Sequence, residues 1–170
     1  MLNTLDNAHN ELLTELSEVD DQLFSLRPTA DQWSVAEVID HLSRVELAVI
    51  QELQKGLDRP AARVSVFKRL IPMQLVSLRL FRVEAPKLVK PLNTKPKQES
   101  LSSYSYLRDQ LKTLCEAQEG KRFRQISMRH PVFGMIDGVA AITMVAHHER
   151  RHLKQVRDIL KTLRTRSAAA

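Results

Sequence analysis

The sequence predicts an all-α protein, a four-helix bundle with a long crossover between the second and third helices. Apolar residues recur at helical spacing along four long stretches, and a connector with several prolines separates the second stretch from the third. Only 4 of the 170 residues are glycine and 43% are hydrophobic, which suits a helical globule. We therefore expect one domain over residues 1–170, with a connector at about 58–99 and a frayed tail at 166–170.

The first helix is predicted over residues 4–26, and Arg27-Pro28 ends it. Its apolar positions alternate at spacings of four and three, as in the seam of a bundle: Leu5, His9, Leu12, Leu16, Val19, Leu23 and Leu26. His9 falls on this seam. We therefore expect a partly buried histidine there, with a place in the lining of a pocket as the alternative.

The second helix is predicted over residues 34–57 because its start carries two capping signals. Ser34 and Glu37 have the spacing of a capping box, and Trp33 can pack on Val38 as a hydrophobic staple. Both signals place the start of the helix at Ser34.

The connector contains an apolar segment with interspersed lysine and arginine, residues 64–83, which Pro72 divides. Its basic side chains could lie along a membrane surface, but we favour a segment that covers the bundle or forms a dimer contact. Residues 83–100 contain three prolines and are expected to form an extended loop.

The third helix is predicted over residues 100–118. Its inward positions are Tyr104, Leu107, Leu111, Leu114 and Cys115. Cys115 lies within this apolar set, so we expect a buried structural thiol rather than a reactive one.

The fourth helix is predicted over residues 138–165, and the residues before it form a short irregular stretch. Gly120 should end the third helix, residues 123–128 should be extended, and residues 130–134 should form a turn. Asp137 can then cap the fourth helix.

Two histidines on the fourth helix predict a metal site. His148 and His152 are four residues apart, so both imidazoles face the same side of a helix and can reach one ion. The pair continues an apolar stripe formed by Ala141, Val145, Val156, Ile159 and Leu163. We therefore favour a buried metal site over two core histidines that only pack and hydrogen-bond. The third ligand must come from upstream, and His41, on the inward face of the second helix, is the best candidate.

The same segment matches the H-E-x-x-H pattern of zinc peptidases, with Glu149 as the general base. No histidine follows His152, and Gln155 stands where one group of these enzymes has a glycine. Asp158 is the only carboxylate after His152. A peptidase is therefore our last choice.

Composition narrows the class of protein further. The net charge is +6, but aromatic residues are only 5% and scattered, so we expect no nucleic-acid partner. The single cysteine cannot form an internal disulfide, which predicts a reducing cytoplasm. We see no signal peptide and no apolar run long enough to span a membrane.

Three local patterns, in order, resemble the DinB/YfiT-like metalloenzyme superfamily. Residues 33–42 resemble its W-S-x-x-E-x-x-x-H-L segment, and residues 130–134 resemble the turn before its last helix. Residues 148–155 resemble its H-x-x-x-H-x-x-Q ending. The resemblance covers nearly the whole chain.

The resemblance implies a divalent ion held by one histidine of the second helix and two of the fourth, which here match His41, His148 and His152. Members of this superfamily commonly bind nickel, zinc or another divalent ion, with iron and manganese as alternatives. Some look like thiol transferases that join a low-molecular-weight thiol, such as bacillithiol or mycothiol, to an electrophile.

Our leading hypothesis is a metal-dependent enzyme that acts on a small molecule, as a thiol S-transferase or a hydrolase. Glu149 is a candidate base or outer-sphere group, with a solvated partner for a nearby Arg or Lys as the alternative. Gln155 is a candidate to orient a ligand histidine. The competing hypothesis is a non-catalytic helical binding module, with a structural metal or none. A homodimer is expected in either case.

Overall fold

The computed structural model describes residues 2–60, 89–92, 94–118, 120–130 and 134–168. Among these residues, four long helices form the bundle: α1 (Leu2–Ser17), α3 (Val35–Leu57), α5 (Lys97–Glu116) and α7 (Gly138–Ala168). The smaller elements are the helices α2 (Asp21–Ser25) and α6 (Gly120–Phe123) and the strands β1 (Ser127–His130) and β2 (Gly134–Asp137). The predicted all-α bundle is confirmed, with one small hairpin added.

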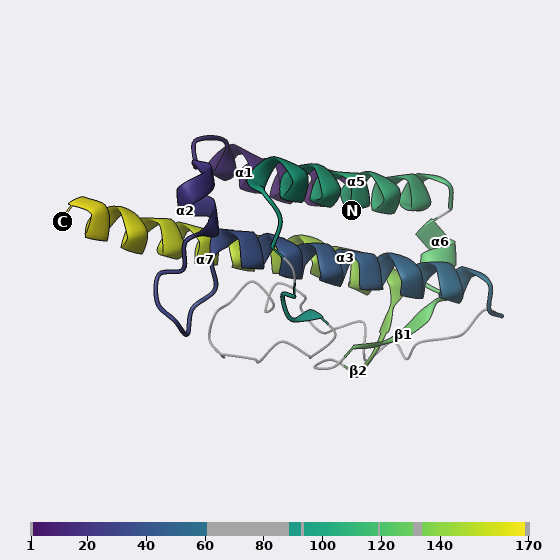
Figure 1. The fold of residues 1–170 in the computed structure, drawn as a ribbon. Coiled ribbons are helices and arrows are strands. Elements are labelled where there is room, and N and C mark those ends of the chain that lie inside the picture. The colour runs from purple at the N-terminus through teal and green to yellow at the C-terminus, as the bar shows by residue number, and fades with distance from the viewer. Residues whose placement is uncertain (1, 61–88, 93, 119, 131–133, 169–170) are drawn as a thin grey trace.

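The order of the helices explains the long connector. In Figure 1, α1 and α5 lie together in one layer, and α3 and α7 lie together in the other. α3 and α5 run in the same direction along the bundle, so the chain between them must return to its starting end. This is the predicted crossover. The segment 64–83 lies outside the described residues, whereas residues 91, 92 and 94–96 are in neither helix nor strand.

The prediction of one helix over residues 4–26 is wrong, because the helix is interrupted. α1 ends at Ser17, and α2 starts after Asp20. The Asp20 carboxylate accepts a hydrogen bond from the backbone N–H of Leu23 at 2.7 Å. A capping aspartate favours the start of a new helix over the continuation of the old one, which a count of apolar spacings does not register.

The predicted capping box of α3 is confirmed in both directions. The Ser34 hydroxyl accepts from the Glu37 backbone N–H at 3.2 Å, and the Glu37 carboxylate accepts from the Ser34 N–H at 2.9 Å. Arg27 also donates to Glu37, through Nε at 2.8 Å. Desolvation acts to raise the pKa of Glu37, but the bonds from Arg27 and Ser34 outweigh it and the pKa is lowered. The start of α3 is therefore held by one carboxylate with several donors.

Removal of the cap should destabilise the protein measurably. We expect Ser34→Ala to lower the free energy of unfolding by about 1 kcal/mol, because the N–H of Glu37 loses its acceptor in a buried position. Urea unfolding followed by circular dichroism measures this. Ser43→Ala is the matched control, since Ser43 lies inside the same helix and only bonds back to the Ile39 carbonyl. Equal losses in the two variants would contradict the assignment.

α5 starts three residues earlier than predicted, at Lys97, and ends at Glu116. Tyr104, Leu111 and Cys115 are buried as expected, and burial raises the pKa of the Cys115 thiol to about 11, which fits an inert thiol. Leu107 and Leu114 are only half-buried, whereas Arg108, which was not among the predicted inward positions, is 2% exposed. Gly120 begins α6 and does not end the preceding helix.

The hairpin before α7 was predicted only as an extended stretch and a turn. β1 and β2 pair antiparallel, from Ser127 opposite Asp137 to His130 opposite Gly134. Gly134 has φ +67°, a backbone conformation that favours glycine, and residues 131–133 of the predicted turn lie outside the described residues. The predicted cap of α7 is confirmed, because the Asp137 carboxylate accepts from the backbone N–H of Ala140 at 2.9 Å.

α7 is longer than predicted, and the fraying of the tail at 166–170 stays a prediction. The helix continues to Ala168, and the hydroxyl of Ser167 donates to the Leu163 carbonyl at 3.2 Å. No helix among the described residues is long and apolar enough to cross a membrane.

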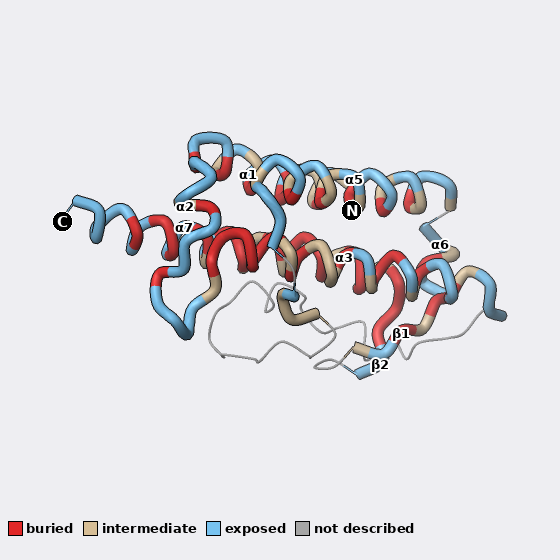
Figure 2. The backbone as a smooth tube through the Cα atoms, viewed as in Figure 1, coloured by how far each residue is buried: buried red, intermediate tan, exposed pale blue. Residues whose placement is uncertain are grey.

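The core of the bundle consists of two apolar clusters, one at each end. The inner faces of all four long helices are buried (Figure 2). One cluster packs around Leu53, Leu111 and Ile142 next to the hairpin, and the other packs around Leu16 and Val156 next to α2. Between them, each long helix contributes a buried polar or charged side chain: His9, Glu46, Arg108 and Glu149. We call these four residues, with Tyr104, the polar layer.

Candidate metal centre

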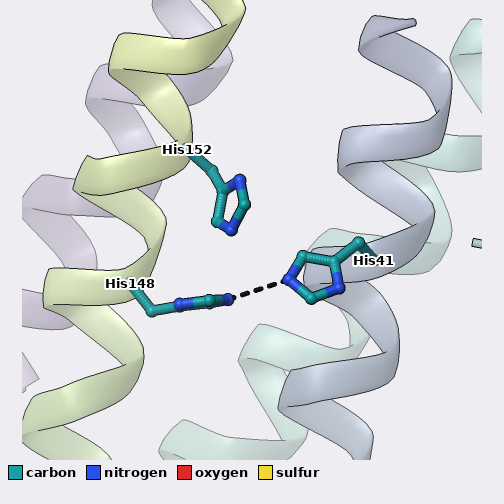
Figure 3. A group of neighbouring side chains, drawn as sticks. All are labelled: His41, His148 and His152. Carbon is teal, nitrogen blue, oxygen red and sulfur yellow. Dashed lines mark hydrogen bonds between the residues drawn. The ribbon is translucent and has the colours of Figure 1, made fainter. Parts of the chain in front are cut away.

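Three histidines from two neighbouring helices converge inside the bundle. His41 lies two turns after the capped start of α3, and His148 and His152 lie one turn apart on the inner side of α7. Figure 3 shows the three rings pointing toward one another. Among the described residues, they are the one group of three or more His, Cys, Asp or Glu side chains close enough to share an ion.

The three rings offer nitrogen atoms at a spacing that suits one ion. Candidate ligand atoms of the three side chains all lie within 4.8 Å of one another. The Nε2 atoms of His41 and His148 are 3.0 Å apart (Figure 3), and the centroid of the His152 ring lies 4.5 Å from that of His148 and 4.8 Å from that of His41. Two nitrogens that bind one ion at about 2.0–2.1 Å are separated by roughly 3.0–3.4 Å at the usual ligand angles, so the spacing fits.

Two of the rings are oriented by hydrogen bonds on their other nitrogen. The Nδ1–H of His41 donates to the carbonyl of Val89 at 2.6 Å, and the Nδ1–H of His152 donates to Oε1 of Gln155 at 2.8 Å. A neutral imidazole that donates through Nδ1 keeps a lone pair on Nε2, which is the atom that faces the cluster. The predicted role of Gln155 in orienting a ring therefore agrees with its geometry.

Burial keeps the three imidazoles neutral. Desolvation lowers the pKa of His41, and it lowers the pKa of His148 to about 3, with smaller contributions from His41, Arg151 and His130. Desolvation also places the pKa of His152 well below its ordinary value of 6.5. Neutral imidazole is the form that binds a metal, so the donor set, its orientation and its charge state all suit a divalent ion.

These shifts predict how the stability of the metal-free protein depends on pH. The folded-state pKa of His148 lies below its unfolded value of 6.5, so the unfolded chain binds more protons and stability falls as the pH drops from 6.5 toward 3. For His148 alone we expect a loss of about 2 kcal/mol between about pH 7.5 and about pH 5. Urea unfolding at the two pH values measures it, and His148→Gln should show a smaller loss. An identical loss in this variant would contradict the prediction.

Glu149 occupies a different place from the one the sequence suggested. Its side chain is fully buried, and neither carboxylate oxygen is free. Oε1 accepts from the Tyr104 hydroxyl at 2.8 Å and from Nδ1 of His9 at 3.1 Å, and Oε2 accepts from Arg108 at 2.9 Å. The solvated ion pair that we gave as the alternative is wrong, and the carboxylate belongs to the polar layer rather than to the histidine cluster.

Arg108 is the centre of the polar layer. Its guanidinium donates to both carboxylate oxygens of Glu46, at 2.7 and 3.1 Å, to Glu149 at 2.9 Å and to the Leu5 carbonyl at 2.7 Å. Desolvation acts to lower the pKa of Arg108, but Glu46, Tyr104 and Glu149 outweigh it and the pKa is raised, so the side chain stays charged. Desolvation raises the pKa of Glu46, partly offset by Arg108.

The remaining histidines differ in their surroundings. His9 is 7% exposed, and its Nε2 lies 3.2 Å from the Ser105 hydroxyl, so the expectation of partial burial understated how deep it lies. His130 and His147 are half-buried, and desolvation lowers the pKa of each. Neither belongs to the three-histidine cluster.

Sequence reasoning missed three participants of these sites: Val89, Glu46 and Arg108. Val89 contributes only a backbone carbonyl, which no side-chain pattern reveals. The positions of Glu46 and Arg108 could have indicated burial, because each interrupts the inward apolar stripe of its helix. Glu46 stands between Leu42 and Val49, and Arg108 stands between Tyr104 and Leu111. A charged residue in such a position indicates a buried partner.

Comparisons with known proteins agree on the family and the fold. A family model described as the DinB superfamily matches residues 4–156. The uncharacterized protein YuaE of Bacillus subtilis (strain 168) is 24% identical over 160 residues, which cover 93% of this chain and 96% of YuaE.

Two solved structures are similar over most of their length. TT2238, described as a four-helix bundle protein, aligns with a TM-score of 0.61 at 19% identity, over 92% of this chain and 95% of TT2238. YfiT from Bacillus subtilis aligns with a TM-score of 0.66 at 14% identity, over 95% of this chain and 85% of YfiT. YfiT is described as a probable metal-dependent hydrolase with an unusual four-helix bundle topology. At these identities, the likeness establishes the fold.

Proposed function

This chain belongs to the DinB superfamily, and on that premise we propose that it is a metal-dependent enzyme that acts on a small molecule. We assign the divalent ion to His41, His148 and His152. The observation that carries the proposal is the convergence of these three neutral imidazoles, from two helices, in the interior of the bundle.

The protein's own residues supply the binding and orientation that such chemistry needs. Val89 and Gln155 hold two of the rings with Nε2 toward the cluster. The centroid of the Trp33 ring lies 5.2 Å from that of the His41 ring, so the two rings pack against each other. A divalent ion held by three imidazoles keeps positions open for substrate and activates water or a thiol as a nucleophile.

The reaction is proposed as hydrolysis or thiol S-transfer. Hydrolysis is supported by the description of YfiT, which shares the fold. Thiol transfer to an electrophile, with a low-molecular-weight thiol as co-substrate, is supported by the resemblance of residues 33–42 and 148–155 to superfamily motifs. Nickel and zinc are the proposed ions, since imidazole suits both.

Glu149 is not included as a general base in this proposal. Its side chain is fully buried, its two oxygens accept from His9, Tyr104 and Arg108 inside the core, and it does not belong to the three-histidine cluster. The same contacts count against a peptidase, whose mechanism requires the glutamate of H-E-x-x-H to act as the base.

A cytoplasmic location and a homodimer remain predictions. Light scattering coupled to size exclusion measures the oligomeric state.

An activity screen tests the proposal. Protein loaded with Ni²⁺ or Zn²⁺ is assayed against chromogenic esters, amides and lactams, and separately against 1-chloro-2,4-dinitrobenzene with a panel of small thiols. We expect metal-dependent turnover in one class and a loss of about 1,000-fold in His148→Ala. His147→Ala is the matched control, because His147 is the adjacent residue but lies outside the cluster. Turnover that survives His148→Ala, or that needs no metal, would contradict the proposal.

The alternative is a non-catalytic helical module with a structural metal. It is the better description if the chain binds one ion tightly, in the three-histidine site, but shows no turnover and no exchange with added chelator. The described residues carry no observation that favours it over an enzyme.

A further inference from the structure

One layer of charged and polar side chains crosses the bundle between its two apolar clusters. Each long helix contributes at least one member: His9 from α1, Glu46 from α3, Tyr104 and Arg108 from α5, and Glu149 from α7. Tyr104 and Arg108 are no more than 2% exposed. The enzyme mechanism proposed above uses none of these residues.

This layer joins the two helices that carry the metal ligands. Along α3, Glu46 follows His41 by about one and a half turns. Along α7, Glu149 lies directly after His148 and within one turn of His152. Arg108, from a third helix, donates to both carboxylates, so a single guanidinium connects the ligand-bearing segments of α3 and α7.

The bonds in the layer leave little freedom of position. Arg108 binds Glu46 through two N–H groups, at 2.7 and 3.1 Å, a planar arrangement that fixes direction as well as distance. Glu149 is held from two other helices at once, because His9 of α1 and Tyr104 of α5 donate to its other oxygen. No buried side-chain nitrogen or oxygen among the described residues lacks a partner.

The apolar clusters do not constrain α7 in the same way. They consist mainly of leucine, isoleucine, valine and alanine on all four helices. Packing of this kind is non-directional and tolerates small rotations and shifts of a helix along its axis. A shift of one turn moves a side chain by about 5.4 Å, and about 1 Å is enough to loosen a functional site.

We propose that the polar layer is a positioning device, which sets the rotation and register of α7 against α3 so that His148 and His152 face His41. A buried polar contact that selects one register among several apolar ones is a known use of such groups. The metal-binding part of the test below rests on the proposed function, whereas the helix register itself does not.

The test replaces the whole layer with apolar residues of similar volume: His9→Leu, Glu46→Leu, Tyr104→Phe, Arg108→Met and Glu149→Met together. Replacing all members at once avoids unpaired buried groups, so the variant can fold. The readouts are the affinity for Zn²⁺ in competition with a chromogenic chelator and the ligand-field absorption spectrum of bound Co²⁺, which reports coordination geometry. We expect a weakening of about tenfold or more and an altered Co²⁺ spectrum.

The matched control removes an exposed ion pair between two of the same helices. Glu15 of α1 and Arg157 of α7 lie 2.6 Å apart at the surface, and Glu15→Met with Arg157→Met should leave affinity and spectrum unchanged. If the apolar layer variant folds and binds Zn²⁺ and Co²⁺ as the unmodified protein does, the positioning role is wrong. If the apolar layer variant does not fold, Arg108→Lys is used as the test variant. Lysine keeps the positive charge but cannot bridge the two carboxylates in a plane. Unchanged affinity and spectrum in Arg108→Lys would overturn the proposal, and weaker binding would support it.

A metal-free readout separates this inference from the proposed function. Spin labels at Leu47→Cys on α3 and Lys154→Cys on α7, both exposed, with Cys115→Ala, report the distance between the two helices by double electron–electron resonance. We expect one narrow distance in the native layer and a broad or shifted distribution in the variant. If the unmodified protein binds no metal, the proposed enzyme function is wrong, and this distance measurement alone then tests the positioning role. Identical distance distributions in the native and the apolar layer would overturn the positioning role.

Discussion

Replacement of His148 by alanine should reduce the divalent-metal content of the purified protein from about one ion per chain to close to zero, and His41→Ala should do the same. Each variant removes one of the three converging imidazoles. Binding free energies of about 10–16 kcal/mol for sites with four ligands imply roughly 3 kcal/mol, or about 100-fold in affinity, for each ligand. The measurement is metal content by mass spectrometry on untagged protein purified without chelators, before and after reconstitution with Ni²⁺ or Zn²⁺.

The control for metal loss is His147→Ala, which removes a half-buried histidine next to His148 and outside the cluster. Its metal content should match that of the unmodified protein. Equal metal content in His41→Ala and the unmodified protein would show that α3 contributes no ligand. If the unmodified protein takes up neither Ni²⁺ nor Zn²⁺, the enzyme proposal fails as a whole.

Arg108→Met should be among the most destabilising single substitutions in the chain, with a loss of about 3–5 kcal/mol in the free energy of unfolding. It removes the only cation bound to both Glu46 and Glu149 among the described residues, and it leaves these carboxylates buried without their counter-charge. Burial already raises the pKa of Glu46 while Arg108 is present. Urea unfolding at neutral pH measures the loss.

The loss in Arg108→Met should shrink in mild acid. Without the guanidinium, we expect the folded-state pKa of Glu46 to rise further above its unfolded value, so the folded protein binds more protons than the unfolded chain and stability decreases as the pH rises. The variant should therefore recover part of its deficit as the pH is lowered from about 7 to about 5, relative to the unmodified protein at the same pH. Arg157→Met is the matched control, because Arg157 pairs with Glu15 at the surface and should cost no more than about 1 kcal/mol. A similar loss in the two variants would refute the stabilising role of Arg108.

Several features of the fold were predictable because their causes are local. The start of α3 depends on Ser34 and Glu37, which are three residues apart, and the capping box forms as expected. The inward face of α7 follows from residues spaced within a few turns, and it correctly places His148 and His152 on the same side. The fold and the candidate ligands therefore follow from short-range patterns.

Other features depend on partners that lie far along the chain. Their charge alone would assign Arg108 and Glu149 to the surface, since a charged side chain is seldom buried, although both stand at inward positions of their helices. They are buried because they form an ion pair with each other, and because Arg108 also pairs with Glu46. These partners lie 41 and 62 residues from Arg108 along the chain. A charged side chain can be buried without a large cost only where a counter-charge and hydrogen-bond partners surround it. A short stretch of sequence around the residue does not show whether such partners will be near.

The all-α bundle and the choice of three histidines as candidate ligands could be predicted from the amino-acid sequence, because periodicity, caps and spacing act within one helix. The contacts of Glu149, the carbonyl that orients His41 and the bond from Arg108 to α7 depend on the packing of helices that are distant in the sequence. The H-E-x-x-H pattern made Glu149 look like a base for the metal, but its carboxylate turns toward three other helix residues in the core. The physical reason is that a buried carboxylate without hydrogen bonds is costly, so it pairs with the donors that lie nearest to it. The packing of the other helices determines which donors those are.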